Sequence, residues 1–103
     1  MISLFKKLFG PKADFARLVN EGALVVDVRT KGEYQAGHIK GSKNIPLDTI
    51  NKEAARLKQL NKPVITVCRS GARSGMAKSI LSGAGIETYN GGAWTSFKKQ
   101  LES

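Results

Sequence analysis

The chain has 103 residues, a length that supports one domain with one hydrophobic core. Its single cysteine excludes a disulfide within the chain, and one cysteine with one histidine cannot complete a closed zinc site. Seventeen Lys and Arg residues against eight Asp and Glu residues give a net charge of +9, which favours anionic ligands.

The basic residues are spread along the chain, without the interleaved aromatic residues of a base-stacking surface. We therefore expect a generally basic, solvated surface and not a nucleic-acid site. A free thiol suits the reducing cytoplasm, which is the location we expect, while a periplasmic location stays open.

Residues 1–11 form an N-terminal segment ahead of a domain that we expect over residues 12–103. Lys6 and Lys7 interrupt the apolar residues of this segment, so it has neither the core of a signal peptide nor the roughly 20 residues of a membrane span. We expect residues 1–10 to pack on the domain or to fray. The alternative is a short amphipathic turn on a lipid surface, with four apolar side chains inserted: Leu4, Phe5, Leu8 and Phe9.

The first half of the domain predicts a helix and two strands. Asp14 can cap a short helix that ends at Gly22. Residues 23–28 form a continuous apolar run rich in β-branched side chains, which is typical of a strand covered on both faces. Residues 29–37 are expected to form a loop with one helical turn, and residues 42–46 a short strand ended by proline.

The second half alternates helices with strands. A helix that begins at Asp48 or Thr49 carries an apolar stripe, and a strand over residues 64–67 follows it. The next helix is expected to begin at Ser74 or Gly75. The remaining predictions are the end of that helix at residues 83–85, a strand over 86–89, a turn over 90–92 and a last helix with Trp94, Phe97 and Leu101 on one face.

Strands that alternate with helices predict an α/β fold with a central, mostly parallel sheet of four to five strands and helices on both faces. Ligands of such folds bind beyond the carboxyl ends of the strands. Asp27 and Arg29 lie at the end of one predicted strand, and Cys68 lies at the end of another. The predicted topology therefore places these three residues at the same edge of the sheet.

Cys68 is the strongest candidate for a reactive residue. It lies between a buried strand and a helix, where backbone N–H groups and the positive end of the helix favour an anion. Arg69 and Arg73 add two positive charges, so we expect the thiol pKa to be lowered. The alternative is an inert core thiol. A reactive thiol requires that the sulfur is not sealed in the interior and that the N–H groups of the loop face it.

Four short motifs follow one another between about residues 14 and 101. They are Val26-Asp27-Val28-Arg29, Glu33-Tyr34 with residues 37–46, the loop from Cys68 to Ser74, and Asn90-Gly91-Gly92-Ala93-Trp94. In this order and at these spacings they resemble the single-domain rhodaneses, which are thiosulfate and related sulfurtransferases. Members of that family usually begin with a short strand, whereas residues 10–13 have little strand character, so this strand is expected to be minimal or missing.

The resemblance implies that Cys68 carries sulfur as a persulfide between a donor such as thiosulfate and a thiophilic acceptor. The acceptor is cyanide in vitro and a thiol, a sulfur-relay protein or thioredoxin in the cell; no metal or cofactor is implied. The resemblance and the loop position make His38 a structural hydrogen-bonding residue, while Asp27 and Arg29 are expected to form a supporting ion pair. The residues expected to bind the persulfide or the substrate are Arg69, Ser70, Gly71, Ala72 and Arg73.

Two roles stay open for each loop arginine, which can hold the donor's oxyanion or steady the loop by pairing with an acid. Four residues separate Cys68 from Arg73, whereas the loops of similar phosphatases and arsenate reductases have five, so the shorter loop favours a single sulfur atom over phosphate. Two further functions stay open beside catalytic sulfur transfer. One is a non-catalytic rhodanese-like binding module, and the second is a sulfur carrier in tRNA or cofactor thiolation that docks through its basic surface.

Overall fold

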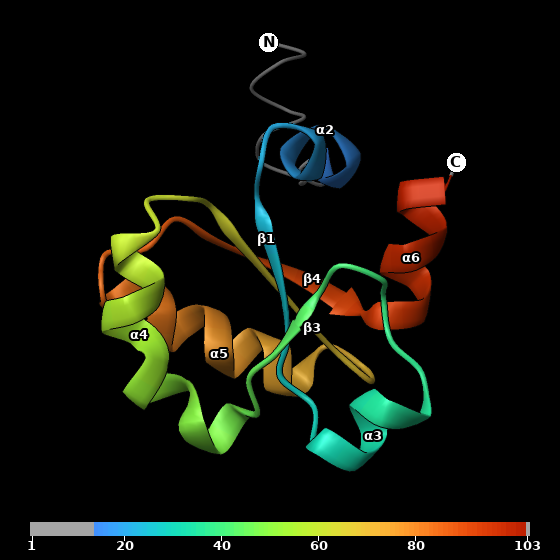
Figure 1. Cartoon of the computed structure of the whole chain (residues 1–103), viewed down its shortest axis with the longest axis horizontal. Coiled ribbons are helices and arrows are strands. Elements are labelled where there is room, and N and C mark those ends of the chain that lie inside the picture. Colours follow the sequence, from blue (N-terminus) through green and yellow to red (C-terminus); the bar gives the residue numbers. More distant parts are fainter. Residues whose placement is uncertain (1–13, 103) are drawn as a thin grey trace, which may run out of the picture.

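A parallel four-stranded sheet forms the centre of the computed structural model, which describes residues 14–102 (Figure 1). The strand order is β2-β1-β3-β4. The strands are β1 (Leu24–Asp27), β2 (Lys43–Asn44), β3 (Val64–Cys68) and β4 (Thr88–Ala93). The predicted α/β fold is confirmed, with four strands. The expectations for residues 1–11, and for a minimal or missing strand at residues 10–13, lie outside the described residues.

The helices precede, connect and follow these strands. They are α2 (Phe15–Asn20), α3 (Lys31–Ala36), the 3₁₀ helix η1 (Leu47–Thr49), α4 (Ile50–Gln59), α5 (Ala72–Gly83) and α6 (Trp94–Glu102). No helix between residues 14 and 102 combines the length and the apolar character needed to cross a bilayer.

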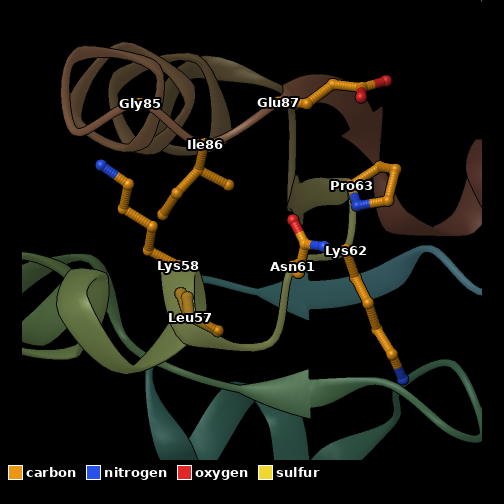
Figure 2. Close-up of a pocket in the computed structure, with 8 residues that line it drawn as sticks. All are labelled: Leu57, Lys58, Asn61, Lys62, Pro63, Gly85, Ile86 and Glu87. Carbon is orange, nitrogen blue, oxygen red and sulfur yellow. The ribbon is translucent and has the colours of Figure 1, made fainter.

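The amino ends of β3 and β4 border a pocket of about 280 Å³ (Figure 2). The amino group of Lys58 reaches toward Gly85, where a Cβ atom would lie 3.0 Å from the Lys58 Nζ. Because Gly85 lies just beyond the carboxyl end of α5, this positive charge complements the negative end of the helix dipole. We therefore assign Lys58 a structural role. The pocket that it lines lies at the amino end of β3, whereas Cys68 lies at the carboxyl end.

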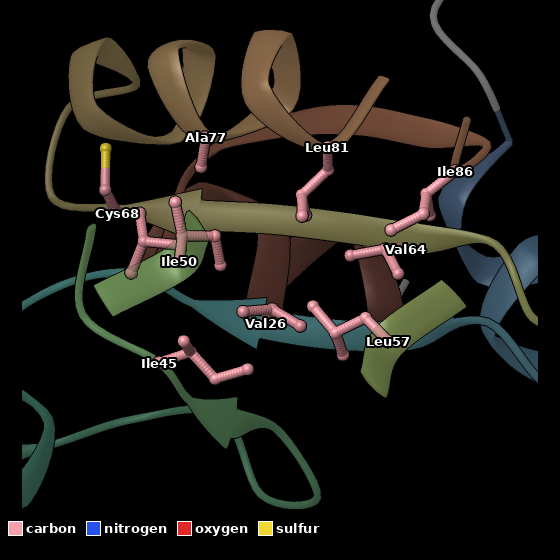
Figure 3. Packing of buried hydrophobic residues seen from close by; sticks show 10 residues of the cluster. Val26, Ile45, Ile50, Leu57, Val64, Cys68, Ala77, Leu81 and Ile86 are labelled. Atoms are coloured by element: carbon pink, nitrogen blue, oxygen red, sulfur yellow. The ribbon is translucent and has the colours of Figure 1, made fainter. Parts of the chain in front are cut away.

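Successive side chains of the central strands alternate between two hydrophobic cores. Val26, Val64 and Cys68 face α4 and α5 on one side of the sheet (Figure 3). Val25 and Ile65 belong to the core on the other side, together with residues of α2 and α6. Helices thus cover both faces, which explains why β1 and β3 are continuous apolar runs.

Side-chain caps define the beginnings of the two short helices near β1. The Asp14 side chain accepts a hydrogen bond of 3.1 Å from the N–H of Arg17, as predicted. Residues 29–37 contain the six-residue helix α3 and not only the predicted single turn. Thr30 and Glu33 form a capping box at its beginning. The Glu33 N–H donates to the Thr30 Oγ1 at 3.2 Å, and the Thr30 N–H donates to the Glu33 Oε1 at 3.0 Å.

The predicted turn at residues 90–92 is wrong, because these residues belong to β4. Thr66 pairs with Asn90 and Val67 pairs with Gly92, so Gly91 is an extra residue on the β4 side. The irregularity is a β-bulge. Glycine is present here because the bulge lies against the core and leaves no room for a side chain, and not because the chain reverses.

Replacing Gly91 with Ala is expected to lower the free energy of unfolding by about 1–3 kcal/mol through overpacking. The new Cβ would lie 2.9 Å from methyl carbons of both Ile65 and Val67 and 3.0 Å from the Phe97 ring. Urea denaturation measures the change. Gly83→Ala is the matched control, because its new Cβ would meet nothing within 4 Å beyond its chain neighbours and the backbone of its own helix, and it should not destabilise the protein. Equal losses in the two variants would contradict the assignment.

Candidate active site

Cys68 ends β3, and its side chain lies at the amino end of α5 (Figure 3). Its sulfur accepts a hydrogen bond of 2.9 Å from the N–H of Gly71 and lies 3.3 Å from the Ser74 Oγ. The residue is only 1% exposed, so its sulfur is almost completely shielded from solvent. The N–H of Gly71 therefore faces the thiol, as expected of a reactive cysteine, whereas the near-complete burial of the sulfur is the feature expected of an inert core thiol.

Hydrogen bonds set the acidity of the Cys68 thiol. Burial is the largest single influence and raises its pKa, but the hydroxyl and N–H of Ser74 and the N–H groups of Gly71 and Ser70 together outweigh it. The pKa is therefore lowered, in the predicted direction. The hydroxyl of Ser74, which ends the loop motif but was not among the expected site residues, is the largest of the lowering influences.

The loop turns directly into α5 at Gly71. This residue has a φ of +105°, in the left-handed region that glycine adopts without strain, and it is the N-cap of the helix. The helix therefore begins at Ala72, earlier than the predicted start at Ser74 or Gly75. The side chains of Arg69, Ser70 and Ala72 are exposed, whereas Ser74 is buried beside Cys68.

Arg73 is held by an acidic residue of α3. Its Nη1 and Nη2 atoms donate to the Glu33 Oε1 and Oε2 at 2.8 and 3.0 Å, a bidentate geometry. Of the two roles left open for this arginine, the structure contains the ion pair with an acid. Arg69 is exposed, and within residues 14–102 it forms no ion pair with an acidic side chain.

The pair between Glu33 and Arg73 predicts a component of acid sensitivity. The hydrogen bond from Arg73, followed by that from the Thr30 N–H, lowers the pKa of Glu33 from 4.5 to about 2. Because the folded-state pKa is below the unfolded value, the ionised carboxylate stabilises the fold above pH 4.5, and this stabilisation disappears as the pH falls toward 2.

Glu33→Gln is therefore expected to lose less stability than the wild type when the pH falls from neutral to about 3. Urea denaturation at the two pH values measures this difference. The matched control is Glu53→Gln, which removes a pair within α4 whose arginine, Arg56, is exposed, and it should change the stability little. An unchanged pH dependence in Glu33→Gln would show that the pair has no influence on acid stability.

Asp27 and Arg29 form the expected ion pair at the end of β1. The Arg29 Nε donates to the Asp27 Oδ1 at 2.9 Å, and the Nη2 donates to the Oδ2 at 2.7 Å. The Nη2 also donates to the Gly37 carbonyl at 2.7 Å, and the guanidinium lies 4.7 Å from the centroid of the Trp94 ring. Arg29 is only 4% exposed. Its contacts with Gly37 and Trp94 link β1 to the segment after α3 and to α6.

His38 makes a structural contact, as expected. Its Nδ1 lies 2.8 Å from the Tyr34 carbonyl oxygen, and its ring stacks on the Tyr34 ring with a centroid separation of 3.8 Å. The Tyr34 hydroxyl in turn donates to the Ser42 carbonyl at 2.6 Å. These contacts order the connection between α3 and β2.

A second pocket, of about 430 Å³, lies between the carboxyl end of β1 and the beginning of α5. Arg73 forms part of its wall, which places it beside the Cys68 loop. Its other lining residues are Val28, Thr30, Lys31, Pro46, Leu47, Asp48 and Thr49. The pocket therefore combines an apolar wall with charged groups on the side of the sheet where Cys68 lies.

A parallel α/β sheet that delivers one thiol into a loop capping a helix defines a class of domain built to hold a negatively charged sulfur or oxygen atom. The family profile of the rhodanese-like domain matches residues 12–100. The chain therefore belongs to the rhodanese-like family, as the four motifs indicated.

Three bacterial relatives are similar to this chain in sequence. The thiosulfate sulfurtransferase PspE of Escherichia coli is 39% identical over 61 residues, which are 58% of this chain and 59% of PspE. The thiosulfate sulfurtransferase GlpE of Pseudomonas fluorescens is 35% identical over 86 residues, 82% of this chain and 75% of GlpE. The uncharacterized protein YqhL of Bacillus subtilis is 38% identical over 69 residues, 66% of this chain and 54% of YqhL.

The chain thus spans little more than half the length of YqhL and PspE. Among solved structures, a rhodanese with anions from E. coli superimposes with a TM-score of 0.65 at 34% identity. That match covers 72% of this chain and 89% of the other. The fold and the family are therefore supported over most of the described residues.

Proposed function

We propose that this protein is a sulfurtransferase that moves sulfane sulfur through a persulfide on Cys68. The observation that carries the proposal is the contact between the Cys68 sulfur and the Gly71 N–H, at the amino end of α5. The lowered thiol pKa supports it, because the thiolate is the nucleophilic form. Relatives at 35–39% identity that are named thiosulfate sulfurtransferases support the same chemistry.

In the first step, the Cys68 thiolate attacks the outer sulfur of a donor such as thiosulfate. A bond forms between the two sulfur atoms while the S–S bond of thiosulfate breaks, and its electron pair leaves with sulfite. The product is a persulfide whose negative charge lies on the outer sulfur. In the second step, cyanide or a thiolate attacks that outer sulfur and the Cys68 thiolate is regenerated, which makes the reaction a two-step transfer.

The loop provides the groups that this cycle needs. Backbone N–H groups between Arg69 and Arg73 hold the negatively charged outer sulfur, while the exposed guanidinium of Arg69 attracts the oxyanion of the donor. Since Cys68 is nearly fully buried, the exposed residues 69 and 70 move aside to admit the donor. The pocket beside Arg73 receives the remainder of a larger donor or acceptor.

The same proposal extends to partners and location. The physiological acceptor is a small thiol, a sulfur-relay protein or thioredoxin, and the net charge of +9 favours anionic donors and acidic partner surfaces. A cytoplasmic location is consistent with a single thiol that must stay reduced.

Intact-mass analysis after incubation with thiosulfate tests the proposal directly. We expect a gain of one sulfur atom per chain, which a reducing thiol removes. If neither thiosulfate, a polysulfide nor glutathione persulfide produces this gain, the sulfurtransferase proposal is wrong and a non-catalytic binding role takes its place. Faster turnover of a chromogenic phosphate ester than of any sulfur donor would favour a phosphatase.

A further inference from the structure

The hydroxyl of Ser74 has one proton but three acceptors within reach. Its Oγ lies 3.3 Å from the Cys68 sulfur, 3.1 Å from the Gly71 carbonyl oxygen and 2.6 Å from the Asn90 Oδ1. Ser74 is completely buried, whereas Asn90 is an exposed residue. The shortest of the three contacts is the one to Asn90, a residue of β4 that is separated from Ser74 by 16 positions.

Two further contacts fix which end of the Asn90 amide faces Ser74. The Gly92 N–H donates to the Asn90 Oδ1 at 2.9 Å, and the Asn90 Nδ2 donates to the Gly71 carbonyl at 3.2 Å. The reversed amide would put a donor against the N–H of Gly92 and an oxygen against the carbonyl of Gly71. The Oδ1 atom is therefore the acceptor that Ser74 meets.

We propose that Asn90 is a positioning residue that accepts a hydrogen bond from the Ser74 hydroxyl while the Cys68 sulfur is uncharged and loses this hydrogen bond to the sulfur when the thiolate forms. In the thiol state, the S–H donates to the Ser74 Oγ and the Ser74 O–H donates to the Asn90 Oδ1. When the thiol proton has left to solvent, the Ser74 O–H rotates toward the sulfur. Ser74 keeps its own proton throughout, and Asn90 retains the hydrogen bond from the Gly92 N–H.

The inference deepens the proposed function on which its catalytic meaning rests. The charge that resides on the Cys68 sulfur in the thiolate moves to the outer sulfur in the persulfide. The Ser74 hydroxyl is then free to return to Asn90. An uncharged acceptor at position 90 thus favours the states in which the Cys68 sulfur carries no charge, which are the thiol and the persulfide.

Asn90→Leu tests the inference because it keeps a similar side-chain volume and removes the competing acceptor. The loss of one neutral hydrogen bond from the thiol state is expected to lower the Cys68 pKa by about 0.5–1 unit. Thiolate ultraviolet absorbance as a function of pH measures this pKa, and Cys68 is the only thiol in the chain. Asn90→Asp keeps an acceptor oxygen and adds negative charge, so it should raise the pKa.

A double-mutant cycle separates positioning from a general effect on the loop. In the Ser74→Ala background there is no hydroxyl to redirect, so Asn90→Leu should no longer lower the pKa. A shift that persists in this background, or an unchanged or raised pKa in Asn90→Leu alone, would overturn the inference. Circular dichroism establishes that each variant is folded. The titration requires no sulfur transfer, so its outcome is independent of whether the persulfide forms.

Discussion

Cys68→Ser is expected to reduce sulfur transfer from thiosulfate to cyanide to the rate measured without protein. Serine occupies nearly the same space and its oxygen can accept the Gly71 N–H, so the fold should be retained. The hydroxyl does not ionise near neutral pH, however, and it cannot form a persulfide. Thiocyanate formation measures the transfer, and thermal unfolding measures the stability of the variant.

The matched control for this prediction returns a thiol to the chain at a different place. Ser79 is exposed on α5, so the variant Cys68→Ser/Ser79→Cys carries one cysteine without the loop of N–H groups. We expect this variant to remain inactive, because a thiol alone lacks the groups that stabilise the thiolate and the persulfide. Thiocyanate production by Cys68→Ser, or recovery of wild-type activity by the double variant, would refute the assigned role of Cys68.

Asp27→Ala is expected to destabilise the protein by about 3–5 kcal/mol, the usual result of leaving a buried charge without its partner. Asp27 is completely buried and Arg29 is 4% exposed, so water cannot replace the lost carboxylate. A loss of this size is a large part of the total stability of a typical domain, which is about 5–15 kcal/mol. Urea denaturation gives the free energy of unfolding for both proteins.

Two variants sharpen this test. Glu21→Ala removes the acid of an exposed pair with Arg17 and should change stability by no more than about 1 kcal/mol. Asp27→Leu/Arg29→Met replaces both buried charges with apolar groups, and it should be more stable than Asp27→Ala. If Asp27→Ala and Glu21→Ala lower the free energy of unfolding by the same amount, the buried pair does not stabilise the fold more than the exposed pair does.

The parts of the fold that follow from local pattern were predictable from sequence. The apolar run of residues 64–67 identified β3, because a strand buried on both faces is a continuous apolar run. The stripe formed by Trp94, Phe97 and Leu101 identified α6, because a helix buried on one face has a helical period in its sequence. The turn assigned to residues 90–92 failed for the opposite reason. Gly91 is small because Ile65, Val67 and Phe97 approach it, and contacts across the sheet leave no local signal.

The candidate site divides in the same way. The position of Cys68 at a strand end and the tight turn at Gly71 were readable from their neighbours. The partner of Arg73 could not be predicted, because Glu33 lies 40 positions away in the sequence. The contact of Ser74 with Asn90 could not be predicted either, because it depends on how β4 packs against α5. One signal was present but unused, since Thr30 and Glu33 have the spacing of a capping box.

Glu33 connects the beginning of α3 to the beginning of α5. Its carboxylate accepts the hydrogen bond from the Thr30 N–H that caps α3, and it also binds the guanidinium of Arg73. Unwinding the first turn of α3 would therefore also release the guanidinium of Arg73 at the beginning of α5. One side chain thus ties the beginning of α3 to the beginning of the helix that follows the reactive cysteine.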